Sequence, residues 1–172
     1  MDYLNTGERI SLLDEGLEVL RLLWSKPEVH FNGKYFKING ARLKNPNMPI
    51  TITVAAKQRK MMEMAAKHAD IWESSYLSPE EFASINSEFE KISNTTTKTI
   101  VKSIELDVII ANSDSELEYK KGLFALVGKP EDIAQKVRKY IDAGIDQFFL
   151  AFQDLFEYKA IQLFVNIMKG IM

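Results

Sequence analysis

The stretch from Ile50 to Glu73 constrains this 172-residue chain most, because one strand pattern gives way there to a helix and then to a second strand. Ile50, Ile52 and Val54 alternate with threonine or polar positions, which is typical of a strand. Residues 61–68 then place methionine and alanine at helical spacing. Strand, turn, helix and strand in this order predict a βαβ unit, in which the helix start after the first strand is a common ligand site.

The rest of the chain repeats this alternation of strands and helices. The other expected elements are a helix over 6–25, hairpin strands at 29–31 and 34–38, a helix starting at 78–81, a strand over 99–111, a helical stretch over 113–126, a helix over 128–144, a strand over 147–152 and a helix over 155–168. Four strand–helix pairs predict an α/β fold with a parallel sheet and right-handed crossovers. No linker interrupts the pattern, so residues 1–172 are expected to form a single domain.

Three short motifs set expected boundaries. Asn32-Gly33 predicts a two-residue hairpin turn, because both residue types tolerate positive φ. Thr6 is the expected N-cap of the first helix. Ser78 and Glu81 form a capping box around Pro79, which predicts a helix start there.

Composition narrows the function classes. The net charge of −2 gives no electrostatic reason to expect a nucleic-acid or membrane partner. The sequence has no cysteine, which excludes disulfides and thiolate chemistry, and its two histidines are too far apart to suggest a metal site. No apolar run is long enough for a membrane span, and the N-terminus does not resemble a secretory signal. A soluble cytoplasmic protein is therefore expected.

The start of the helix after the Ile50–Val54 strand carries Lys57, Arg59 and Lys60. Backbone N–H groups at a helix start attract anions, and nearby cations strengthen that attraction. The alternative is that these are solvated charges on an ordinary loop.

Other polar and aromatic residues have simpler interpretations. Asp70 is expected to fix the backbone at a strand start, Trp72 to lie in the core, and His68 to be partly exposed beside a helix end. Glu105 and Asp107 flank one residue of a strand and therefore share a face. They either point inward or are exposed at an edge.

Several segments together resemble the luciferase-like monooxygenase superfamily. They are ERISLLDEGLEVLRLLW, FNGKYFKI, PITITVAA, MAAKHADIW and LVGKPEDIAQKVRKYIDAGIDQFFL, in that order. The resemblance implies a TIM-barrel type fold of which this chain carries strands five to eight and a β-hairpin excursion. A complete barrel needs about 250 residues, so a half barrel is expected.

The resemblance also implies a cofactor, either reduced FMN or the deazaflavin coenzyme F420. The family holds the cofactor phosphate in the loop after strand five. The matching positions here are Ala55, Ala56, Lys57, Gln58, Arg59 and Lys60. This loop lacks the glycines common in the family, which hinders close backbone approach. No catalytic residue can be assigned, because the family's catalytic positions in strands one to four have no counterpart.

Two functions remain open. The first is a flavin- or deazaflavin-dependent oxidoreductase that performs hydride transfer or monooxygenation on a small molecule, with the missing barrel half supplied by another chain. The second is a catalytically silent half-barrel homodimer, the remnant of a truncated or split gene, that binds an anionic ligand or none. Open strand edges and an uncovered inner face predict self-association or a partner chain in either case.

Overall fold

The computed structural model describes residues 4–44, 49–111, 125–152 and 158–171. The helices are α1 (Thr6–Ser25), α2 (Arg59–His68), α3 (Pro79–Ser93), α5 (Pro130–Asp142) and α6 (Tyr158–Lys169). The strands are β1 (Val29–Asn32), β2 (Lys37–Ala41), β3 (Thr53–Ala55), β4 (Ile71–Ser75), β5 (Val101–Ile110), β6 (Ala125–Gly128) and β7 (Gln147–Phe152). None of the helices in these ranges is long and apolar enough to cross a membrane.

Strands β3 to β7 form a parallel sheet, and β1 and β2 form a separate antiparallel hairpin. β5 is the central strand. Its residues 103–105 pair with both β4 and β7, so these two strands lie on opposite edges of β5. Residues 107–108 pair with both β6 and β7. β6 therefore lies on the same edge as β4 and continues it beyond Ser75.

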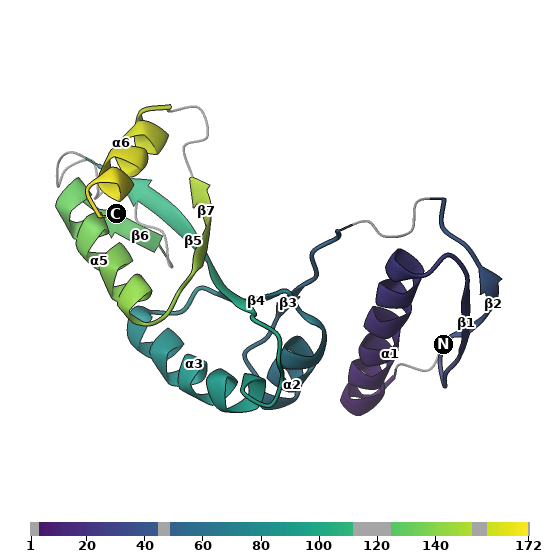
Figure 1. The fold of residues 1–172 in the computed structure, drawn as a ribbon. Coiled ribbons are helices and arrows are strands. Elements are labelled where there is room, and N and C mark those ends of the chain that lie inside the picture. The colour runs from purple at the N-terminus through teal and green to yellow at the C-terminus, as the bar shows by residue number, and fades with distance from the viewer. Residues whose placement is uncertain (1–3, 45–48, 112–124, 153–157, 172) are drawn as a thin grey trace.

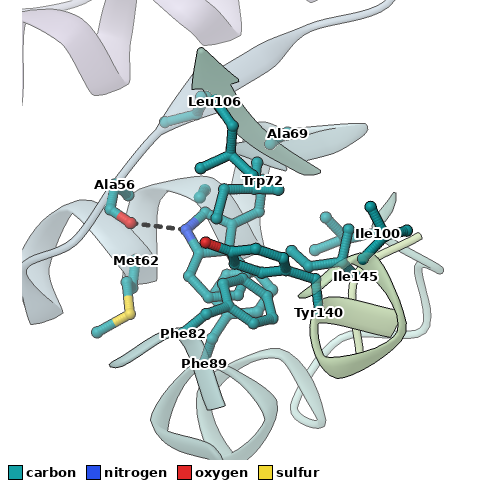
Figure 2. Close-up of a cluster of buried hydrophobic side chains, with 14 of the residues drawn as sticks. Ala56, Met62, Ala69, Trp72, Phe82, Phe89, Ile100, Leu106, Tyr140 and Ile145 are labelled. Carbon is teal, nitrogen blue, oxygen red and sulfur yellow. Dashed lines mark hydrogen bonds between the residues drawn. The ribbon is translucent and has the colours of Figure 1, made fainter. Parts of the chain in front are cut away.

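Helices α2, α3, α5 and α6 lie along the outer side of this sheet (Figure 1). The hydrophobic core between the sheet and these helices has aromatic side chains at its centre. Trp72 of β4 is fully buried and stacks on two rings of α3, with centroid distances of 3.9 Å to Phe89 and 5.6 Å to Phe82. Figure 2 shows these rings together, with Tyr140 of α5 beside them. Parallel strands covered by helices on this side confirm the predicted α/β fold, and residues 1–172 as a single domain stay a prediction.

Two predicted elements need correction. The helical stretch was placed over 113–126, but Ala125 and Leu126 belong to strand β6, and residues 113–124 lie outside the described ranges. Strand β6 pairs with Asp107–Ile110 of β5, and this long-range pairing determines that residues 125–128 are extended. The N-cap of α1 is Asn5 rather than Thr6, because the Asn5 side chain accepts a hydrogen bond from the Glu8 N–H.

The predicted two-residue hairpin turn is also wrong. Asn32 pairs with Lys37 in the ladder, so residues 33–36 form the loop, and Gly33 has no positive φ. A carboxylate of α1 replaces the expected turn chemistry. Glu15 accepts hydrogen bonds from the backbone N–H groups of Tyr35 (2.6 Å) and Phe36 (3.0 Å). The hairpin is therefore held against α1 by Glu15.

Replacing Gly33 by alanine is expected to detach this loop. A Cβ at residue 33 would lie 1.6 Å from Glu15 Oε1, so the carboxylate would have to move away from both N–H groups. Loss of these partly buried hydrogen bonds should cost about 1–3 kcal/mol of unfolding free energy, measured by urea denaturation. Gly7→Ala is the control, since a Cβ there meets only Asn5 Oδ1 at 3.4 Å and should leave the unfolding free energy nearly unchanged. Equal stability of the two variants would contradict the role of Glu15.

Candidate functional site

The start of α2, which follows β3, is the predicted anion site. Gln58 is the N-cap, but its side chain makes no capping hydrogen bond, and the first turn contains no acidic residue. The first N–H groups of any helix lack intrahelical acceptors. The starts of α1 and α3 differ, since an N-cap side chain accepts a hydrogen bond there and the first turn carries an acid. The start of α5 has no capping side chain at its N-cap but carries two acids, and α6 has no acid in its first turn. Cations at this end oppose the helix dipole and would be stabilised by a bound anion.

The six predicted positions do not contribute equally. Ala55 is the exposed last residue of β3, and Ala56 is buried, with its N–H donating to the Glu73 carbonyl and its carbonyl accepting from Trp72 Nε1. Ala56 therefore anchors the loop and cannot offer its N–H to a ligand. The exposed residues Lys57, Gln58, Arg59 and Lys60 complete the loop and open the helix.

The three cations of this loop also differ in their present partners. Arg59 pairs with Glu63 on its own helix and lies 3.6 Å from Glu88 of α3. Hydrogen bonds with Ser78 lower the pKa of the Glu81 carboxyl, and the nearby charge of Lys57 lowers it further. Lys60 forms no ion pair with the residues that the structure describes. Whether these residues bind a cofactor stays a prediction.

Asp70 fixes the backbone where β4 begins, as expected. Its carboxylate accepts from the Ile52 N–H at 2.8 Å, and it forms ion pairs with Arg21 of α1 and with Lys98. Burial alone would raise the pKa of Asp70, but the Ile52 N–H, Lys98 and Arg21 outweigh it and lower the pKa to about 2. Asp70 therefore joins α1 to the start of the sheet and is not available for acid–base chemistry.

His68 was expected to be partly exposed, and this is wrong. Its side chain is only 7% exposed, and its Nε2 lies 2.6 Å from Asp14 of α1. Burial alone would raise the pKa of Asp14, but hydrogen bonds from Lys67 and His68 outweigh it and lower that pKa. His68 and Asp14 are 54 positions apart in sequence, so local pattern gave no signal for this contact.

A cavity of about 450 Å³ lies between the β4–α3 turn and α5. Its lining includes Tyr76, Leu77, Lys139 and Tyr140, and the Tyr140 hydroxyl donates to the Leu77 carbonyl. This cavity is separate from the α2 start in its lining residues. The α3 start beside it has its capping box closed by Ser78, so its N–H groups are less available to an anion.

The face of the sheet opposite these helices is acidic. Trp72 of β4 and Lys102 of β5 point toward α3. Side chains alternate between the two faces along a strand, so Glu73 of β4 and Glu105 and Asp107 of β5 point to the other face. Residue Tyr76 follows β4 with a positive φ of 54°, a strained conformation for a bulky residue. The negative charges of Asp107 and Glu105 are the main causes that raise the pKa of the Tyr76 phenol.

The sequence did not single out Tyr76 or Ser103 as site residues. Ser103 lies between Glu73 and Gln147 in the register, and its buried hydroxyl finds no hydrogen-bond partner in the described ranges. The sequence of β4 and β5 does contain a signal for this polar face. Every second residue of a strand lies on the same face, and polar residues occupy such alternating positions in both strands.

Comparisons with known proteins agree with this geometry. The profile described as luciferase-like monooxygenase matches residues 3–121. Pyrimidine monooxygenase RutA of Acinetobacter baylyi is 26% identical over 114 residues, which cover 64% of this chain and 31% of that enzyme. RutA of Yersinia enterocolitica is 30% identical over 119 residues, which cover 67% of this chain and 32% of the enzyme. The chain thus spans about a third of these curated relatives.

Solved structures show the same fold. An F420-dependent secondary alcohol dehydrogenase in complex with an F420–acetone adduct superposes with a TM-score of 0.82 at 15% identity, covering 99% of this chain and 64% of that one. The long-chain alkane monooxygenase LadA gives a TM-score of 0.76 at 19% identity, covering 99% of this chain and 56% of that one.

The parallel strands and their outer helices thus define a partial (β/α) barrel. The profile match over most of its length places it further: the chain belongs to the luciferase-like monooxygenase family.

Proposed function

We propose that this chain forms the strand five-to-eight half of a luciferase-like oxidoreductase and that another chain supplies the remaining barrel strands. The proposed reaction is hydride transfer or monooxygenation of a small molecule. Reduced FMN or coenzyme F420 supplies the reducing chemistry when bound. Names of solved neighbours support both cofactors, since one structure contains an F420–acetone adduct and another a modified FMN.

The observation that carries this proposal is the uncapped, cationic start of α2. A cofactor phosphate would be held by the first N–H groups of α2, with Lys57 and Lys60 beside them. Ala56 would fix the loop through its bonds to Glu73 and Trp72. The role of this chain in the reaction is then to bind and orient the phosphate end of the cofactor.

Thermal unfolding with added FMN or F420 tests this proposal. At about a 100-fold excess over Kd, a bound cofactor should add about 2.7 kcal/mol to the unfolding free energy. The double variant Lys57→Gln/Lys60→Gln should lose most of this gain, whereas Lys44→Gln, an exposed lysine in the loop after β2, should keep it. No stabilisation of the wild-type chain by either cofactor would contradict phosphate binding by this half alone.

We also propose, as the second candidate, a catalytically silent half-barrel homodimer. Two observations favour the absence of cofactor binding in this candidate: the Ala56 N–H is already bonded, and Arg59 already has acidic partners. A chain that dimerises and gains no stability from either cofactor would support this candidate over the first.

A further inference from the structure

The inner side of the sheet has a composition unlike that of a filled barrel. Barrel interiors are packed mainly by branched apolar side chains arranged in layers. Here the inward positions of β4 and β5 include three carboxylates, Glu73, Glu105 and Asp107, which we call the inner acidic face. Ser75 bonds Glu73 at 2.8 Å and lies directly beside Glu105 in the register. The acids are therefore neighbours on one surface.

Within the part of the chain that the structure describes, this surface has no cation paired with its acids. Glu73 is only 8% exposed, yet across the described ranges no lysine, arginine or histidine forms an ion pair with any of the three carboxylates. A partly buried carboxylate without a counter-charge is unfavourable. The described acids also form no group that could hold a metal ion. Among the described residues, nothing supplies the counter-charge that these acids lack.

A buried hydroxyl points into the same surface. Ser103 is 0% exposed, and its Oγ has no hydrogen-bond partner among the described residues. It alternates with Lys102, which reaches Glu90 of α3 on the outer side, so Ser103 points to the inner side next to Glu73. Buried polar groups are normally satisfied. The unsatisfied hydroxyl and the carboxylates together make the inner side the face of the sheet that lacks polar partners among the described residues.

The strand edges show from where such groups can approach. Among the described strands, β3 pairs only with β4, and β7 pairs only with β5. Each of these strands therefore has an open edge, and further strands added there would curve around the inner acidic face. A second copy of this chain would bring the same three carboxylates opposite the first set, and like charges at short range repel.

We propose that the inner acidic face is a docking surface for barrel-closing strands of a partner polypeptide that carry arginine or lysine at their inward positions. This inference rests on the proposed function only in requiring a second set of strands. The inference specifies the charge of those added strands and disfavours a homodimer joined through the inner acidic face.

The test uses the full chain and a synthetic peptide of alternating arginine and valine, with a glutamate–valine peptide as its counterpart. Fluorescence anisotropy should show binding of the arginine peptide that weakens in high salt. The variant Glu73→Gln/Glu105→Gln/Asp107→Asn should bind it at least about tenfold more weakly. Equal binding of the two peptides, or an unchanged affinity in this variant, would overturn the proposal.

A matched control separates this face from overall charge. Glu18→Gln/Glu131→Gln/Asp142→Asn removes the same three charges from exposed helix positions and should leave peptide affinity unchanged. Thermal unfolding gives a second readout, because neutralising the inner acids should raise the Tm of the isolated chain. A lower Tm would show that the acids already have partners and would overturn the proposal.

A second copy of the chain is the remaining occupant to exclude. Wild-type dimers that protect β4 and β5 from hydrogen exchange would show self-association through this face and would also overturn the proposal. None of these measurements includes a cofactor. Failure of FMN or F420 to bind therefore leaves their outcome unchanged, and the two proposals can fail separately.

Discussion

Replacing Trp72 by alanine should cost about 3–5 kcal/mol of unfolding free energy, the range measured for large aromatic truncations in cores. The indole is fully buried between β4 and α3 and stacks on Phe82 and Phe89. It also donates a hydrogen bond from Nε1 to the Ala56 carbonyl at 2.7 Å (Figure 2). Since native domains are stable by only about 5–15 kcal/mol, this single change should remove much of the stability.

Urea denaturation followed by far-UV circular dichroism measures this effect. Trp72→Phe is the informative control, because it retains an aromatic ring but loses the Nε1–H donor. It should cost less, about 1–3 kcal/mol, mainly from the unpaired Ala56 carbonyl. A cost below about 1 kcal/mol for Trp72→Ala would show that the site relaxes around the loss and that the stacked core is not a main source of stability.

The same variants connect the core to the candidate site. Ala56 is fixed from one side by Trp72 and from the other by the Glu73 carbonyl. In Trp72→Phe, backbone amide hydrogen exchange should increase more at the start of α2 than in the strands of the sheet. The loop that we propose for the phosphate is therefore positioned by the core of the neighbouring strand.

Elements with local signals were predictable from the sequence. The capping box at Ser78 and Glu81 set the start of α3, and the apolar run of β7 was found with its observed bounds. Each depends on residues within a few positions of one another, so the sequence pattern contains the whole signal.

Features that depend on distant contacts were not predictable. β6 exists because it pairs with β5, and His68 is buried because Asp14 of α1 reaches it. Glu15 likewise holds a hairpin loop that begins 18 positions later at Gly33, in place of the expected turn. For the candidate site, the sequence identified the cationic loop but could not show that the Ala56 N–H is already used.

Replacing Asp70 by asparagine should destabilise the chain by about 2 kcal/mol at neutral pH, since charge-assisted hydrogen bonds are the stronger ones. The carboxylate receives Ile52 N–H, Arg21 and Lys98, and asparagine would leave the two cations without their counter-charge. Because Arg21 belongs to α1, the junction between α1 and the sheet should weaken first. Urea denaturation of both proteins at pH 7 measures the difference.

The pH dependence of this difference identifies its cause. A carboxylate whose pKa is lowered from 3.8 to about 2 by folding contributes stability above pH about 4 and loses it as the pH falls toward 2. Solvent screening of the partly exposed cations limits this contribution to about 1–2 kcal/mol. The gap between wild type and Asp70→Asn should therefore be constant near neutrality and narrow between pH 4 and 2. Asp142→Asn, which removes one charge from an exposed helix end, is the matched control for the loss of a carboxylate. A gap that is unchanged at pH 2 would mean that Asp70 acts through its shape and not through its charge.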